Sequence, residues 1–190
     1  MRITYNSPAV LTFTLICTAV MLLDDFTMHG LTRSLFTVYP DMELADPVTY
    51  FRLVSHAAGH AGWGHLVSNL TLILLLGPML EEKYGSQKLL IMMFITALVT
   101  GILTTTLFNA GLLGASGIVF MYIILSSLTN FRSGQVPLTF ILVVLLFLGN
   151  EVVTSFEDDN ISQFAHIIGG VCGSVFGYST GNGKNQLFTA

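Results

Sequence analysis

Charged side chains are scarce in this sequence, and their scarcity excludes a water-soluble protein. Only 9% of the 190 residues are Asp, Glu, Lys or Arg, whereas a soluble domain carries about a quarter. Apolar residues make up 53% of the chain, and the mean hydropathy is +0.74. The composition therefore indicates a polytopic membrane protein. The length predicts one compact membrane domain over residues 1–190, with no sizeable soluble domain.

Cysteines and basic residues are also few. The two cysteines, Cys17 and Cys172, both fall inside apolar stretches. They offer neither a disulfide framework nor a metal-binding spacing, so we interpret them as small core residues. The net charge is only −4, which gives no electrostatic footprint for nucleic acid. We therefore expect the lipid bilayer, and no nucleic acid, as the surroundings of this chain.

Long apolar runs recur along the chain, and a membrane helix needs about 20 mostly apolar residues. The first run is followed directly by Asp24 and Asp25 and lacks a convincing cleavage site, so we interpret it as a helix and not as a signal peptide. The sequence predicts an all-α bundle of six membrane-spanning helices, at about 8–28, 65–82, 88–109, 114–131, 137–156 and 163–180.

The distribution of basic residues predicts the orientation. One side of the six-helix topology carries Arg2, Lys83, Lys88, Arg132 and Lys184. The other side carries Arg33 and Arg52 together with most of the acidic residues. We therefore expect both termini to be cytoplasmic. Residues 29–64 would form a long extracytoplasmic first loop, too long for a simple connector, with structure of its own.

Polar side chains recur near the start of three of the predicted helices. His65 and Asn69 lie near the start of the second, Ser116 near the start of the fourth and His166 near the start of the sixth. These three helices run in the same direction, so the four side chains are expected at roughly 5–10 Å below one membrane surface. Polar groups in lipid need partners or water. The pattern predicts a shared, water-accessible cavity that opens to the extracytoplasmic side.

The residues in this cavity suit nucleophilic catalysis. A serine hydroxyl attacks a carbonyl only when a base takes its proton, and histidine is the usual base. Ser116 and His166 would supply that pair. Glu151 lies near the end of the fifth predicted helix, so a dyad is favoured over a triad. His65 and Asn69 share one helix face at i, i+4, and with the Ser116 amide they form a candidate oxyanion hole.

Each of these residues also has a structural interpretation. Ser116 could be a helix N-cap or a packing residue, His166 a satisfied buried histidine, and Asn69 a hydrogen-bonding group between helices. Small residues at Gly169, Gly173 and Gly177 indicate close helix packing. That packing would bring the sixth predicted helix against the fourth and shorten the distance from His166 to Ser116. The joint pattern favours a site.

The chain resembles the rhomboid intramembrane serine proteases, in their minimal six-helix bacterial form, over nearly its whole length. Gly114, Ala115, Ser116 and Gly117 fit the GxSG motif of that family. The other matching motifs are HxxxxHxxxN at His60, His65 and Asn69, AHxxGxxxG at Ala165, His166, Gly169 and Gly173, GxxxExxxG at Gly77, Glu81 and Gly85, and Phe51-Arg52 in place of Trp-Arg.

The resemblance implies a serine endopeptidase with Ser116 as nucleophile and His166 as general base. His65, Asn69 and the Ser116 amide would stabilise the oxyanion. It also implies a first loop partly in the outer leaflet, and a fifth helix and cap loop that gate substrate entry. Substrates would be single-span membrane proteins with helix-weakening residues near the outer surface. Neither a cofactor nor a metal is expected, and the location would be the bacterial inner membrane.

One position departs from the family pattern. Where the family often has a tyrosine stacked on the catalytic histidine, this chain has Phe120. A phenyl ring can still stack on an imidazole, but it lacks the hydroxyl. The family resemblance leaves the oligomeric state and the physiological substrate open.

Two other functions fit parts of the sequence. A metal-dependent membrane protease or metal transporter could use His56, His60 and His65, although no HExxH motif is present. A noncatalytic protein that binds transmembrane segments would share the fold without needing the dyad. Inhibition by serine-reactive reagents, but not by chelators, would distinguish the protease from both.

Overall fold

The chain folds into helices packed side by side. The structure, a computed structural model, describes residues 3–40, 43, 45–128, 138, 141, 142, 145 and 160–181. The helices with assigned bounds are α1 (Pro8–Phe26), α2 (Gly30–Leu35), α3 (Pro47–Ser55), the 3-10 turn η1 (His56–Ala58), α4 (Trp63–Tyr84), α5 (Ser86–Leu107), α6 (Ser116–Leu128) and α8 (Asn160–Gly181). In these described parts, extended pairing is confined to one antiparallel bridge between Val38 and Leu112.

Three of the described helices are long and apolar enough to cross a membrane, namely α1, α4 and α5. They correspond to the predicted helices at 8–28, 65–82 and 88–109. The predicted helix at 114–131 corresponds to the shorter apolar helix α6, and the one at 163–180 to α8. The predicted helix at 137–156 lies almost wholly outside the described residues. The total of six spans and the cytoplasmic termini therefore stay predictions.

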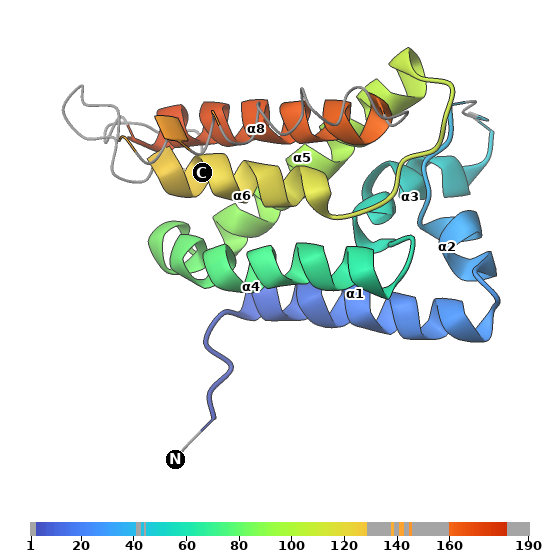
Figure 1. The fold of residues 1–190 in the computed structure, drawn as a ribbon, viewed down its shortest axis with the longest axis horizontal. Helices are drawn as coiled ribbons and strands as arrows, with labels where there is room; N and C mark the ends of the chain where they lie inside the picture. Colours follow the sequence, from blue (N-terminus) through green and yellow to red (C-terminus); the bar gives the residue numbers. More distant parts are fainter. Residues whose placement is uncertain are drawn as a thin grey trace.

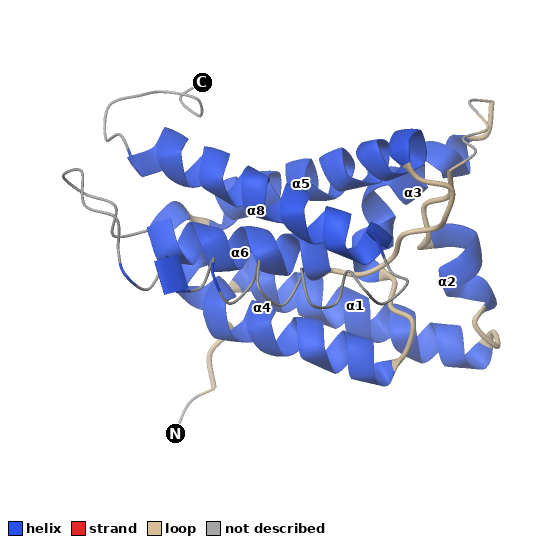
Figure 2. Cartoon of the chain, turned by 45° about the horizontal axis from the view of Figure 1, so that its top comes forward, coloured by secondary structure: helices blue, strands red, loops and turns tan. Residues whose placement is uncertain are grey.

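The order of the helices in space differs from their order in the chain. Helix α4 lies between α1 and α6, and α8 packs on the other side of α6 (Figure 1). Helix α5 contacts all four of these helices, α8, α6, α4 and α1, and so packs across the whole row. The short helices α2 and α3 lie together at the end of the bundle where α1 ends (Figure 2). The N-terminal ends of α4 and α6 point to this same end.

A buried carboxylate fixes α1 against α4. Glu81 is only 5% exposed, and its two oxygens accept hydrogen bonds from the N–H groups of Ala9 at 2.9 Å and Val10 at 3.0 Å. These N–H groups belong to the first turn of α1, where no carbonyl of the helix can accept them. One turn earlier on α4, a Cβ at Gly77 would lie 2.6 Å from Val10 Cγ2. Gly77 and Glu81 of the GxxxExxxG motif thus pack α4 against α1, whereas Gly85 ends α4 with a φ of +80°.

The predicted first loop, residues 29–64, does contain structure of its own. Helix α2, helix α3 and η1 all lie within it. Helix α3 starts with Pro47, and the carboxylate of Asp46 caps it by accepting from the Val48 N–H at 2.9 Å. It then packs on α5, where a Cβ at Gly101 would lie 3.1 Å from the carbonyl carbon and from the Cα of Leu53. This contact holds the end of α3, and therefore η1, close to the start of α6.

Candidate active site

Glycines bring α6 and α8 into backbone contact. A Cβ added at Gly169 of α8 would lie 2.8 Å from the carbonyl carbon of Gly117 and 3.0 Å from its Cα. A Cβ at Gly173 would lie 2.6 Å from the Met121 carbonyl oxygen. No side chain fits at either position without moving the helices apart. The predicted contact between these two helices is therefore present, and it lies directly beside Ser116.

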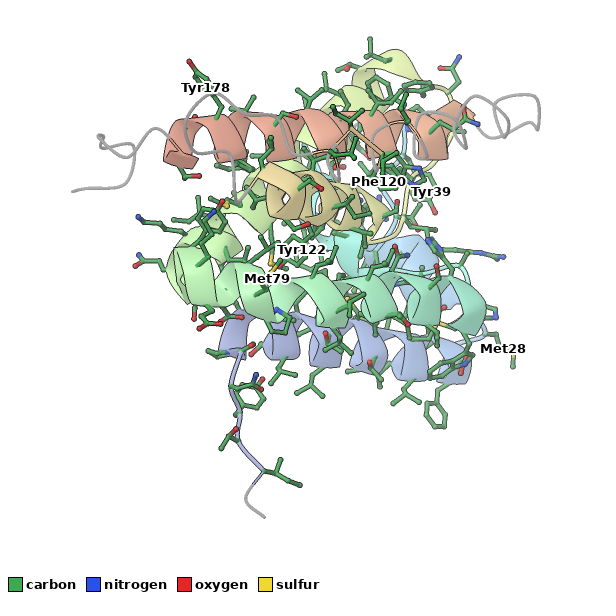
Figure 3. All side chains as sticks on the ribbon, turned by 60° about the vertical axis from the view of Figure 1, so that its left-hand side comes forward. Met28, Tyr39, Met79, Phe120, Tyr122 and Tyr178 are labelled. Carbon is green, nitrogen blue, oxygen red and sulfur yellow. The ribbon has the colours of Figure 1, made fainter. Side chains whose placement is uncertain are left out.

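His166 and Phe120 stack across this contact. Their ring centroids are 4.0 Å apart and the ring planes differ by 11°. Figure 3 shows Phe120 between the ribbons of α6 and α8. Phe120 follows Ser116 by four residues on α6, so the two share a helix face. Ser116 and His166 thus lie on facing sides of the two helices, and both are half-buried. The stacking expected from the sequence is present with phenylalanine.

His65 packs against the loop that leads into α6. A Cβ at Gly114 would lie 2.7 Å from Cε1 and 2.9 Å from Nε2 of His65. Gly114 also has a φ of +122°, which side chains rarely adopt. Glycine is therefore required here twice, for the backbone conformation and for the imidazole. Nε2 of His65 therefore lies beside Gly114, which precedes Ser116 by two positions in the chain.

Asn69 follows one turn deeper on the same face of α4. It is 5% exposed, and its Nδ2 donates a hydrogen bond to the His65 carbonyl oxygen at 3.0 Å. One of its two amide N–H groups therefore serves its own helix. The structure thus places Asn69 next to His65, as the spacing predicted, and a direct role at an oxyanion would use the second N–H.

His60 lies beside His65 at the candidate site. The ring of His60 is almost fully buried and meets the His65 ring edge-on, with centroids 5.1 Å apart. Burial, and next the neighbouring His65, lower the pKa of His60 to about 4. His60 is therefore neutral at pH 7, and its Nδ1 lies 3.3 Å from the Ala58 carbonyl oxygen. The edge-on contact packs this neutral ring against the ring of His65.

His56 has a role that the sequence did not reveal. Its Nε2 lies 3.0 Å from the Ala97 carbonyl oxygen on α5 and donates to it. Its own carbonyl accepts from the Gly114 N–H at 2.9 Å. Burial lowers the pKa of this imidazole, which keeps it neutral. His56 therefore fixes the loop before Ser116 to α5, and no spacing rule would have found this contact.

A second tether holds the same loop. Val38 and Leu112 exchange two backbone hydrogen bonds, from Val38 N–H at 3.0 Å and from Leu112 N–H at 2.9 Å. Together with the bond from Gly114 to His56, this gives three backbone hydrogen bonds within the few residues before α6. The start of α6, and the Ser116 amide with it, is thereby positioned by the segment between α1 and α4.

The three histidines of the metal hypothesis do not share a centre. Nε2 of His56 is directed to Ala97, whereas the His60 and His65 rings meet each other. Within the residues that the structure describes, no group of three His, Cys, Asp or Glu side chains is arranged to hold a metal ion. Glu151 and residues 157–159 of the predicted cap loop lie outside the described residues, whereas residues 160–162 belong to α8.

Comparison with known proteins identifies the family. The family model of the rhomboid domain matches residues 47–183, which is most of the chain and includes His56, His60, His65, Asn69, Ser116, Phe120 and His166. The chain belongs to the rhomboid family. As a rhomboid protein with several apolar helices of spanning length, it is an integral membrane protein.

Similar curated proteins include bacterial and animal members of the rhomboid family. The rhomboid protease GlpG of Haemophilus influenzae is 25% identical over 143 residues, which cover 74% of both chains. YdcA of Bacillus subtilis is 31% identical over 130 residues, covering 65% of this chain and 63% of YdcA. Mouse rhomboid-related protein 2 is 28% identical over 160 residues, covering 72% of this chain and 52% of the mouse protein.

Proposed function

We propose that this chain is an intramembrane serine endopeptidase that cleaves membrane-protein substrates through a Ser116–His166 dyad. The observation that carries the proposal is the stacking of His166 on Phe120, one turn from Ser116 on the same face of α6. It is supported by the backbone contact between Gly117 and Gly169, which brings the two helices together at that level. The protease named among the relatives supports the same class of reaction.

The proposed reaction starts with proton transfer from Ser116 to His166. The Oγ of Ser116 attacks the carbonyl carbon of the scissile peptide as His166 accepts the proton, which gives a tetrahedral oxyanion. His166 then returns the proton to the leaving amine and an acyl-enzyme remains. A water molecule, deprotonated by His166, releases the acyl group by the same steps in reverse. The Phe120 stack restricts rotation of the imidazole throughout.

The oxyanion would be stabilised from the N-terminal end of α6. Ser116 is the first residue of α6, so its N–H group and the partial positive charge of the helix N-terminus are directed at the developing charge. The Gly114 N–H is engaged by the His56 carbonyl and is not available as a donor. Nδ1 of His65 accepts weakly from the Ala61 N–H at 3.5 Å. Nε2 of His65 would therefore carry a proton and serve as a second donor.

Substrates would reach this site within the membrane. The dyad lies near the N-terminal ends of α6 and α8, and His65 lies in the first turn of α4. With the orientation given by the basic residues, this level corresponds to the extracytoplasmic side. A transmembrane segment must unwind there before its backbone can enter the site. Helix-weakening residues near that surface would therefore define good substrates.

The test compares purified wild-type protein with Ser116→Ala in detergent or vesicles. A single-span substrate with helix-weakening residues should be cut by the wild type, and a fluorophosphonate should label the wild type alone. Cleavage by Ser116→Ala would exclude the serine mechanism. Binding without cleavage or labelling would favour the noncatalytic interpretation, and loss of cleavage in chelator, restored by zinc, would favour a metal site.

A further inference from the structure

A groove of about 500 Å³ lies between α3 and α5, outside the proposed catalytic site. Its exposed surface is almost entirely apolar. The hydroxyl of Ser55 is turned away, because it donates to the Leu35 carbonyl oxygen at 2.5 Å. A polar ligand or an isolated water would lose hydrogen bonds in such a groove. The residues that line it include Val54 and Ser55 from α3, and Phe94 and Leu98 from α5.

The groove lies at the depth of the lipid chains. Helix α5 is the most apolar of the three candidate spans, with a mean hydropathy of 2.1 over 18 residues. Leu98 and Phe94 precede its last residue by nine and 13 positions, which places them about 14 and 20 Å below that end at ~1.5 Å per residue. The hydrocarbon core is about 30 Å thick. Phe94 is 52% exposed, so the groove opens to the acyl chains of the surrounding bilayer.

The groove is separated from the proposed substrate path. Thr100 faces the other side of α5, where its Cγ2 would lie 3.3 Å from a Cβ at Gly117. At ~100° per residue, Leu98 lies about 200° around the helix from Thr100. The groove therefore lies on the opposite side of α5 from Gly117 and the neighbouring Ser116. The remaining apolar occupant at this depth is lipid.

We propose that the acyl chain of a phospholipid, from the leaflet that contains α3, binds in this groove as a structural lipid. A chain in the groove contacts two helices at once, whereas a chain against a single convex helix contacts one. The residues on the two walls also flank the hydrogen bond from His56 to Ala97. Val54 and Ser55 immediately precede His56, and Leu98 immediately follows Ala97.

The bound chain would support the active-site loop indirectly. His56 holds Gly114 through its carbonyl, and the groove is lined by Val54 and Ser55, which directly precede His56. An empty groove leaves the end of α3 without packing on one side, so η1 would move more freely. A filled groove would restrict η1, and through it residues 108–116. The lipid would thus act on positioning without contacting substrate.

The experiment uses the purified full chain in detergent with a phospholipid that carries a diazirine on its acyl chain. Photolabelled peptides are mapped by mass spectrometry. We expect labels on residues 47–55 and around Phe94 and Leu98. Leu98→Trp fills the groove and should lose these labels. The matched control is Leu75→Trp on α4, which makes the same change at a side chain that is 70% exposed and should keep them.

Several results would overturn the proposal. Labels spread evenly over the lipid-facing surface of the wild type would show that the groove holds no bound chain. Preferential labelling by a diazirine fatty acid, or a protein recovered in the groove by crosslinking, would show a different occupant. These wild-type results count even if Leu98→Trp fails to fold. Unchanged hydrogen exchange of residues 108–116 on lipid addition would refute the coupling to the loop, whatever the state of the proteolytic activity.

Discussion

The contact between Gly117 and Gly169 makes a sharp prediction for Gly169→Ala. The new Cβ would lie 2.8 Å from the Gly117 carbonyl carbon and 3.0 Å from its Cα. Carbon atoms pack at about 3.5–4.0 Å, so α8 must move away from α6 by roughly 1 Å. His166 precedes Gly169 by one turn and would move with it, away from Ser116. A displacement of ~1 Å at reacting groups can lower the rate about 100-fold.

The adjacent residue provides the matched control. A Cβ at Gly170 would meet nothing closer than Ile124 Cγ1 at 3.6 Å, an ordinary contact. Both changes replace a helical glycine by alanine, so the gain in helix propensity of about 1 kcal/mol is the same and cancels in the comparison. We expect Gly170→Ala to keep wild-type activity and at least wild-type thermal stability. The difference between the variants then reports the helix contact alone.

The assay measures kcat and KM on a fluorogenic transmembrane substrate, together with the rate at which a fluorophosphonate labels Ser116. We expect Gly169→Ala to lower kcat and the labelling rate about 100-fold, with a smaller change in KM. Thermal unfolding of each variant shows how much of the chain is folded at the assay temperature. If folded Gly169→Ala worked within about twofold of Gly170→Ala, the geometric argument for the dyad would be refuted.

Three further predictions concern the site itself. Ser116→Ala and His166→Ala should each abolish cleavage while the protein still folds, and the double variant should be no slower than either single one, because the two act as a unit. His65→Ala and Asn69→Ala should each lower kcat at saturating substrate, by up to about 10²–10³ for a full oxyanion donor; unchanged rates in both would remove them from the mechanism. The depressed pKa of His60, about 4, means that the unfolded chain binds more protons than the folded chain between pH 4 and about 6.5. Stability should therefore be full above pH 6.5 and fall as the pH is lowered toward 4, and His60→Gln should flatten this part of a pH series of thermal unfolding.

Relations within one helix could be predicted from the sequence, whereas contacts between distant segments could not. The i, i+4 spacing of His65 and Asn69 predicted their common helix face, because that relation is local to one helix. The same reasoning could not show that Asn69 donates to the His65 carbonyl, since rotamers depend on the surroundings. Residue spacing also could not show that His56 has a role other than in a possible metal site. Its actual partners, Ala97 and Gly114, lie far away in the chain.

The sequence by itself determined the class of protein and the identity of the chemical groups. Few charges and long apolar runs require a membrane environment, because unpaired charges are too costly in lipid. The glycine motifs specified where helices can approach, since a residue without a Cβ can be read directly from the chain. These are properties of composition and of contacts within one helix.

Only the tertiary structure decided which individual residues of the helices meet. The sequence predicted that the helix of Gly169 packs against the helix of Ser116, but it did not predict that Gly169 itself meets Gly117. That contact stacks His166 on Phe120 and brings it to the face of α6 that carries Ser116. It also joins the segment of α3 and η1 to the loop before α6 through His56 and Val38. Contacts of this kind depend on the packing of the whole bundle at once, and so no local pattern in the sequence encodes them.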